Sequence, residues 1–174
     1  MGKIALTTTQ GENLAGTPWQ VYPRPQMKRA CWQNLNGQWE FTVSREKTMP
    51  DHYDRTILVP FAPESRLSGI GEHFPEGSYL CYRREFEVDT SKKGRFLLHF
   101  GAASQYAEIY VNQMQVGEHQ GSYENFTFDI THLLRENNTY SGFCKKRLLE
   151  PIFLPRSSIQ SQEKFLLFPG ALTV

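Results

Sequence analysis

Hydrophobic and polar positions alternate most regularly between Arg95 and Thr131, and the pattern predicts three β-strands there. In each of three short runs, every second residue is apolar. A period of two places one set of side chains on a buried face and the other set on a wetter face. The apolar positions are Phe96, Leu98 and Phe100; Ala107, Ile109 and Val111; and Phe126, Phe128 and Ile130.

Residues that tolerate tight or left-handed backbone separate these runs. They are Gly101, the Asn112-Gln113 pair and the segment from Gly117 to Gly121. The sequence therefore predicts antiparallel strands that are neighbours along the chain, with a turn at each of these three places.

Three further strands are predicted on the N-terminal side, at Trp39–Val43, Ile57–Val59 and Tyr79–Val88. The first follows Asn36-Gly37, which is a strong turn signal. In the third, Arg84 shares a face with aromatic residues. Its guanidinium group must be hydrogen-bonded if that face is buried, because an unpaired buried charge is costly.

The pattern changes after Asp129. Thr131 offers a hydroxyl acceptor and predicts a capped helical turn at His132–Glu136. A further alternating strand is expected next, to complete the second sheet. Tyr140–Val174 instead contains short apolar clumps without a sustained period, and no regular element is predicted for it. At the other end, Met1–Thr17 is polar and is predicted to be a mobile arm.

Composition favours a single β-sandwich or barrel. A chain of 174 residues has room for a sizeable core, and it carries twelve Phe, eight Tyr and three Trp among short, turn-punctuated segments. The net charge of +1 argues against a nucleic-acid or anionic-membrane partner. The odd count of three Cys favours a reducing compartment, and no apolar run approaches a membrane span, so a cytoplasmic location is expected.

Motifs for metal, cofactor or nucleophile chemistry do not stand out. The five His lack metal-ligand spacing, and neither HExxH, a paired CxxC nor GxSxG occurs, so no metal or cofactor is predicted. Glycoside hydrolysis needs only two carboxyl groups, and Glu85 and Glu87 lie about 7 Å apart on one strand face. A solvated sheet face explains that pair better. The residues alone predict no catalytic centre.

A few loop residues are candidates for ligand contact, each against a structural alternative. The long Pro60–Gly77 segment is rich in Pro and Gly, and long ordered loops often carry function. Within it, Glu72 either caps backbone or contacts a ligand. Phe74 and Tyr123 are either core plugs or rings on which a sugar stacks, and His119 either packs or faces a partner.

Several segments resemble, in order and spacing, the N-terminal sugar-binding domain of glycoside hydrolase family 2, which contains β-galactosidases, β-glucuronidases and β-mannosidases. They are YPRPQMKRACWQNLNGQWEF, ILVPFAPESRLSGI, YRREFEV and the whole Arg95–Thr131 stretch. The VPFAPES–LSGI form is most similar to bacterial β-galactosidase-type members. The resemblance implies an all-β, galactose-binding-like jelly-roll sandwich at residues 18–139, between the arm at 1–17 and a divergent tail at 140–174.

The resemblance also implies what the chain lacks. In the family an immunoglobulin-like domain and a (β/α)₈ barrel follow, and the barrel supplies both catalytic glutamates. No catalytic residue is carried over, and the chain alone is expected to be inactive. Because the likeness ends near Thr139, the jelly roll is expected to be incomplete at its C-terminal end. A disordered tail and a misjoined reading frame are both hypotheses for the tail.

Three functions remain open at this point. The first is a non-catalytic domain that braces the barrel and lends its Pro60–Tyr79 loop to the substrate pocket. The second is a free-standing carbohydrate-binding module, and the third is a truncated, non-functional product with exposed strand edges. The expected ligand is a β-galactoside or related glycoside, and family enzymes are often homo-oligomers. The candidate substrate contacts are Glu72, His73, Phe74, His119 and Tyr123.

Overall fold

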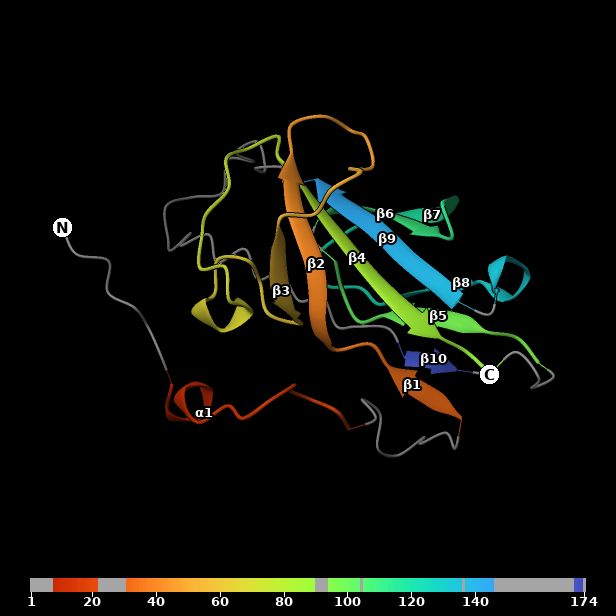
Figure 1. Cartoon of the computed structure of the whole chain (residues 1–174), viewed down its shortest axis with the longest axis horizontal. Helices are drawn as coiled ribbons and strands as arrows, with labels where there is room; N and C mark the ends of the chain where they lie inside the picture. The colour runs from red at the N-terminus through yellow and green to blue at the C-terminus, as the bar shows by residue number, and fades with distance from the viewer. Residues whose placement is uncertain are drawn as a thin grey trace, which may run out of the picture.

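A computed structural model of the chain describes residues 8–21, 31–89, 94–103, 105–135, 137–145 and 171–173. Within these ranges two antiparallel sheets form, one of six strands in the order β3-β2-β4-β9-β6-β7 and one of four in the order β1-β10-β5-β8 (Figure 1). The strands are β1 (Trp32–Asn34), β2 (Gly37–Ser44), β3 (Arg55–Val59), β4 (Tyr79–Glu87), β5 (Leu97–Phe100), β6 (Tyr106–Val111), β7 (Met114–Gln120), β8 (Phe126–Asp129), β9 (Asn137–Lys145) and β10 (Ala171–Thr173). The short helices are α1 (Thr9–Glu12), η2 (Arg66–Ser68) and η3 (Thr131–Leu133).

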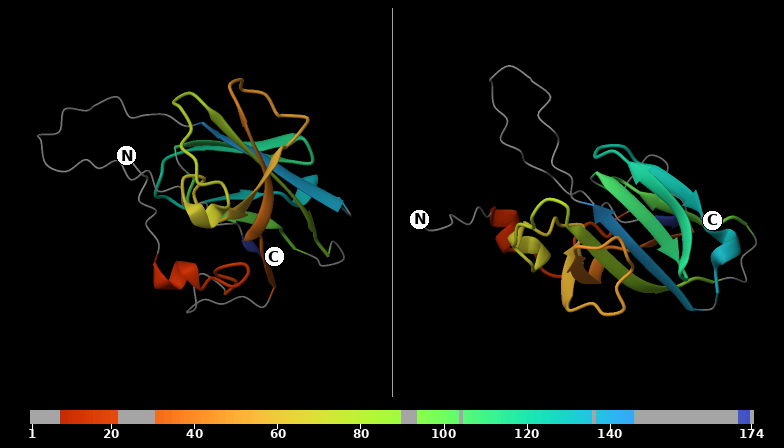
Figure 2. Two further views of the ribbon diagram at one scale, coloured as in Figure 1. Left: turned by 60° about the vertical axis from the view of Figure 1, so that its left-hand side comes forward. Right: turned by 90° about the horizontal axis from the view of Figure 1, so that it is seen from above.

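The predicted all-β sandwich is confirmed. The two sheets lie as layers whose facing side chains form one apolar core (Figure 2). Phe41, Ile57, Leu80, Leu98 and Ile109 are at most 1% exposed and come from five different strands. Burying a side chain of this size stabilises the fold by about 1.5–3 kcal/mol. In β2 and β5 the alternation of apolar and polar residues matches the alternation of buried and more exposed positions, so this pattern selects the inner face.

Arg84 is hydrogen-bonded on the inner side of β4, as its place among aromatic residues required. Its Nη1 donates to the carbonyl oxygens of Leu35 (2.9 Å) and Asn36 (3.1 Å), in the connection between β1 and β2. Burial lowers the pKa of the Arg84 guanidinium below its ordinary value. This side chain therefore ties the connection between the two sheets to β4.

The predicted turn at Gly117–Gly121 is wrong, because Gly117 lies inside β7. A Cβ atom at this position would lie 2.3 Å from Cε1 of Phe128, which belongs to the opposite sheet. Glycine here allows the close approach of an aromatic ring rather than a turn. The hairpin between β6 and β7 turns at Asn112-Gln113, where both residues have positive φ (51° and 68°) as the sequence suggested.

The predicted Thr131 cap is also wrong. The turn η3 starts at Thr131 itself, after an Ile130 cap that makes no side-chain hydrogen bond. The Thr131 hydroxyl instead accepts from the Phe96 backbone N–H (2.8 Å) and donates to Asp129 Oδ1 (2.5 Å). Asp129 Oδ1 also accepts from the Thr131 N–H at 3.0 Å. The aspartate orders this turn, and the threonine ties the turn to the residue just before β5.

The strand expected after this turn is present as β9, which lies between β4 and β6 in the middle of the larger sheet (Figure 1). It extends six residues past Thr139, where the likeness was expected to end, and β10 inserts between β1 and β5. Residues 146–170 lie outside the described residues, so the hypotheses of a disordered or misjoined tail stay untested there.

The N-terminal segment is partly described. Residues 1–7 of the predicted arm lie outside the described residues, whereas residues 9–12 form the short helix α1, which Thr8 caps. This helix lies beside the η2 loop, where a Cβ on Gly11 would be 3.2 Å from Leu67 (Figure 2). Across the described ranges no helix has the length and apolar character needed to cross a lipid bilayer.

Candidate functional site

The loop between β3 and β4, residues 60–78, is folded on its own hydrogen bonds. Ser68 is 1% exposed, and its hydroxyl donates to Ser65 O (2.7 Å) and accepts from Ile70 N (3.0 Å). Backbone bonds join Ser65 N to Ala62 O (2.9 Å) and Glu72 N to Pro63 O (3.1 Å). A loop with this many internal bonds holds a defined shape, which a binding loop requires.

The three predicted contacts in this loop differ in exposure. Phe74 is buried and packs on Phe41 with ring centroids 5.9 Å apart, so its ring fills the core. Glu72 is exposed and accepts a hydrogen bond from Arg55 Nη1 at 2.8 Å. That bond raises the pKa of Arg55 above its ordinary value. His73, between them, is exposed to solvent.

The other two predicted contacts lie near the end of β7. The His119 ring stacks on Phe126 with centroids 3.9 Å apart, and Phe126 stacks on Phe100 at 4.7 Å. Burial lowers the pKa of His119, whose Nε2 finds no hydrogen-bond partner among the residues that the structure describes. Tyr123, in the following loop, is 83% exposed.

These two groups of residues cannot form one site. Glu72 is hydrogen-bonded to Arg55 on β3, and His119 belongs to β7. Strands β3 and β7 are the opposite edges of the six-stranded sheet. Five inter-strand spacings of about 4.8 Å separate the two edges by roughly 24 Å. The loop group and the His119–Tyr123 group are therefore separate candidates.

A buried carboxylate on the outer face of β6 was missed by the sequence analysis. Glu108 is 3% exposed and accepts from the hydroxyls of Tyr106 (2.6 Å) and Tyr110 (2.9 Å) and from Lys47 Nζ. Burial alone would raise its pKa, but the bonds from Lys47 and the two tyrosines outweigh burial and hold the pKa below its ordinary value. A Tyr-x-Glu-x-Tyr run on one strand face was the available signal.

The residues around Glu108 fasten the β2–β3 connection, residues 45–54, across the outer face of the larger sheet. Lys47 comes from this connection, and its Met49 packs with Tyr53 against the fully buried Cys81. The Arg83 guanidinium lies 4.4 Å from the centroid of the Tyr53 ring. We call residues 45–54 the strap.

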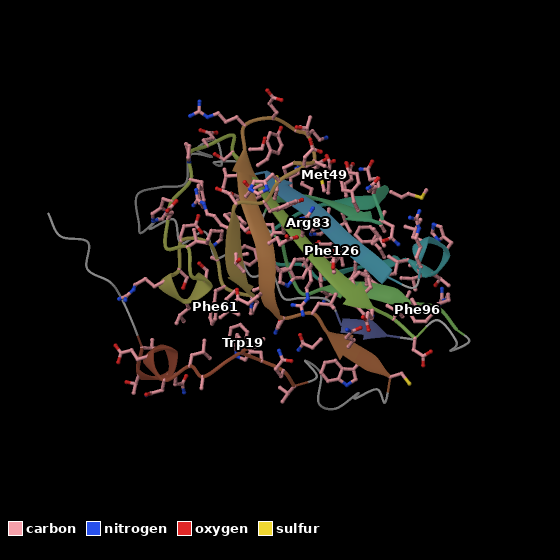
Figure 3. The ribbon with its side chains drawn as sticks, in the orientation of Figure 1. Trp19, Met49, Phe61, Arg83, Phe96 and Phe126 are labelled. Atoms are coloured by element: carbon pink, nitrogen blue, oxygen red, sulfur yellow. The ribbon has the colours of Figure 1, made fainter. Side chains whose placement is uncertain are left out.

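A tryptophan near the N-terminus is held in an unusual backbone conformation. Trp19 has a φ of 51° and is 52% exposed, and its ring lies 5.8 Å from Phe61 (Figure 3). The side-chain amides of Asn34 (2.8 Å) and Asn36 (3.2 Å) both donate to its carbonyl oxygen. In the described part of the chain no group of three or more metal-ligating side chains comes together.

Comparison with known proteins gives one family. The family described as "Glycosyl hydrolases family 2, sugar binding domain" matches residues 53–144. A β-galactosidase of Thermoanaerobacter pseudethanolicus is 43% identical over 110 residues, covering 61% of this chain and 14% of that protein. The Felis catus β-glucuronidase is 28% identical over 171 residues, covering 86% of this chain and 26% of that protein.

Solved structures support the fold. A β-glucuronidase from an uncultured Clostridium species matches with a TM-score of 0.60 and 22% identity, covering 87% of this chain and 30% of that chain. A Lactobacillus rhamnosus β-glucuronidase matches with a TM-score of 0.57 and 22% identity, covering 68% of this chain and 22% of that chain. The chain thus spans less than a third of each of these four relatives.

Proposed function

This chain belongs to the sugar-binding domain family of the family 2 glycosyl hydrolases, and we propose that it braces the catalytic domain of such an enzyme and lends its Pro60–Tyr79 loop to the substrate pocket. Carbohydrate is the ligand class that goes with this family. The observation that supports this role is the set of hydrogen bonds that gives the loop a defined shape. Internal serine and backbone bonds and the Arg55–Glu72 bond hold a long loop that exposes His73 at the β3 edge.

The substrate we propose is a β-galactoside. The β-galactosidase relative is 43% identical to this chain, whereas the Felis catus β-glucuronidase is 28% identical. A β-glucuronide is the alternative, since both relatives carry the same kind of domain. Both glycosides are therefore included in the binding titration described below.

The test is a chimera in which this chain replaces the matching domain of the Thermoanaerobacter pseudethanolicus β-galactosidase. We expect 4-nitrophenyl β-galactoside to be hydrolysed by the chimera and not by the isolated chain. Replacing residues 69–76 with a Gly-Ser linker should lower kcat/KM by about tenfold or more, because positioning contacts to the substrate are lost. A linker variant with full kcat/KM would show that the loop does not serve the pocket.

A free-standing carbohydrate-binding module is the second candidate, and the exposed Tyr123 favours it. An 83% exposed ring beside the exposed residues Glu124 and Asn125 offers a sugar both a flat apolar face and hydrogen-bond partners. Calorimetric titration of the isolated chain with methyl β-galactoside and methyl β-glucuronide tests it. Binding in the millimolar range or tighter that Tyr123→Ala abolishes would support this function, and no binding would reject it.

The location and assembly of the protein remain proposals as well. Cys31 is exposed and Cys81 is buried, and both are free thiols, which supports a reducing compartment such as the cytoplasm. Homo-oligomer formation is proposed only for an enzyme that contains this domain.

A further inference from the structure

One residue of β3, Arg55, holds the Glu72–Phe74 tripeptide of the loop at both of its ends. Its Nη1 donates to Glu72 Oε2 at 2.8 Å, and its guanidinium carbon lies 5.7 Å from the centroid of the Phe74 ring. Glu72 and Phe74 flank His73 in the sequence. A single side chain therefore limits the freedom of the backbone on either side of the histidine.

The orientation of Arg55 is itself fixed from the strand. Its Nε lies 3.6 Å from Oδ2 of Asp54, the preceding residue, while Nη1 faces Glu72. Two carboxylates on different edges of a planar guanidinium group restrict its rotation. A lysine ammonium group has no planar edges and could not be oriented in this way.

The Phe74 contact connects this arrangement to the core. Phe74 is 9% exposed and packs against Phe41 of β2, which is fully buried. A guanidinium group within about 6 Å of a ring centroid is attracted to its face. Arg55 therefore joins a rigid part of the sandwich to the exposed part of the loop.

His73 is the residue that this arrangement presents. Its side chain is exposed, and among the described residues no hydrogen bond or ion pair involves it. A neutral imidazole has one donor and one acceptor nitrogen, which matches a sugar hydroxyl that both donates and accepts. Arg55 is engaged with Glu72 and Asp54, so its role is to place the histidine.

We propose that Arg55 is a positioning residue that fixes His73 for a hydrogen bond with a hydroxyl group of the pyranoside substrate. This inference rests on the proposed function of the loop. It adds a specific ligand contact and the residue that orients it.

A double-mutant cycle in the chimera tests the proposal. His73→Ala should lower kcat/KM for 4-nitrophenyl β-galactoside about three- to tenfold, the effect of one neutral hydrogen bond. Arg55→Ala should lower it about two- to fivefold, and Arg55→Lys should recover part of that loss. In the His73→Ala background, Arg55→Ala should have almost no further effect, because residues that act through one contact are not additive. Equal losses in both backgrounds would overturn the proposal.

Arg83 supplies a matched control. It also bridges a carboxylate and a ring, since its guanidinium group pairs with Glu40 and lies over Tyr53. Its side chain is 34% exposed, against 35% for Arg55. Arg83→Ala should leave kcat/KM within about 1.5-fold of the parent chimera, because it removes the same kinds of contact away from the loop.

An NMR measurement on the isolated chain tests the proposal without a hydrolysis assay. In Arg55→Ala the NMR order parameter of the His73 amide should fall from that of ordered backbone to below about 0.6, while Arg83→Ala leaves it unchanged. An unchanged order parameter in Arg55→Ala overturns the positioning role. The two proposals also fail differently. A linker variant with full kcat/KM rejects the loop's function. A linker variant with lowered kcat/KM, together with a His73→Ala variant whose kcat/KM is unchanged, rejects only this inference.

Discussion

Replacing Glu108 with glutamine should destabilise the domain at neutral pH. The carboxylate is 3% exposed and accepts from Tyr106, Tyr110 and Lys47. A glutamine of the same shape loses the charge, so the charge-assisted bonds from Lys47 and the two tyrosines become weaker neutral ones. Its –NH₂ group also needs a tyrosine hydroxyl that turns round to accept. The packing is therefore kept while the charge-assisted hydrogen bonding is lost.

The size of the effect follows from the bonds that change. A hydrogen bond to a charged group contributes about 1.5–3 kcal/mol, and the bonds from Tyr106 and Tyr110 are both of this kind. Tyr106 keeps a second acceptor, Glu118 Oε2, at 2.6 Å, so its loss is partly offset. We therefore expect Glu108→Gln to lower the free energy of unfolding by about 2–3 kcal/mol.

The assay is urea unfolding followed by tryptophan fluorescence at two pH values. The pKa of Glu108 is held below its ordinary value of 4.5, so its stabilising contribution is complete above pH 4.5 and is lost as the pH falls through the lowered pKa. The difference between wild type and Glu108→Gln should therefore shrink in acid. A difference below about 0.5 kcal/mol at pH 7, or one that does not change with pH, would refute the reasoning.

The reactivity of Cys81, which lies beneath the strap, reports on how firmly the Lys47–Glu108 pair holds the strap in place. Cys81 is fully buried beneath Met49 and Tyr53, and burial raises the pKa of its thiol to about 11. Lys47→Met keeps the aliphatic stem and removes the charge, with its ion pair to Glu108 and its contact with the Tyr106 ring, so it should speed alkylation of Cys81 severalfold with little global unfolding. Peptide mapping by mass spectrometry separates Cys81 from the other two cysteines, and an unchanged rate would show that Lys47 does not hold the strap.

Four further predictions test the fold. The pKa of His119 is below its ordinary 6.5, so the folded state resists protonation; stability should fall as the pH drops below 6.5, and His119→Phe should remove that slope in urea titrations. Gly117→Ala should cost about 2–3 kcal/mol in urea unfolding, because its Cβ would overlap the Phe128 ring. Arg84→Met should cost about 2 kcal/mol by the same measurement, because it leaves two carbonyls without their donor. A chain that ends at Thr139 should lack the cooperative transition of the full chain in circular dichroism, because most of β9 is removed.

Alternation made the strands of the inner face predictable. In β2, β5 and β6 the apolar positions point inward with a period of two, so the local pattern and the global fold agree. The requirement on Arg84 followed as well, since a charge among aromatic residues has few alternatives to a hydrogen bond. Both inferences needed only neighbours that are close in sequence, although the carbonyls that meet the requirement on Arg84 lie about fifty residues earlier in the chain.

Inferences that depended on distant residues failed. Gly117 was taken for a turn because the Phe128 ring, which requires the glycine, lies on another strand of the opposite sheet. Glu108 lies on the outer face, as the alternation predicts, but its burial there is not predicted, because its partner Lys47 lies about sixty residues earlier in the chain. The candidate contacts come from two different loops, and strand order, which the sequence does not give, places His119 and Glu72 at opposite edges of the sheet.

The position of β9 shows why the weakest sequence pattern can occupy the centre of a sheet. Its nine residues, NNTYSGFCK, do not alternate, yet they pair with β4 from Asn137 to Lys145 and with β6 from Tyr140 to Lys145. A strand with a partner on each side receives its register from two backbone ladders, so its own side chains need to specify less. Without it, β4 and β6 would each present an unpaired edge. The sandwich therefore does not end near Thr139, where the resemblance read from the sequence ends. It needs at least the backbone that continues to Lys145, and the family match likewise continues to residue 144.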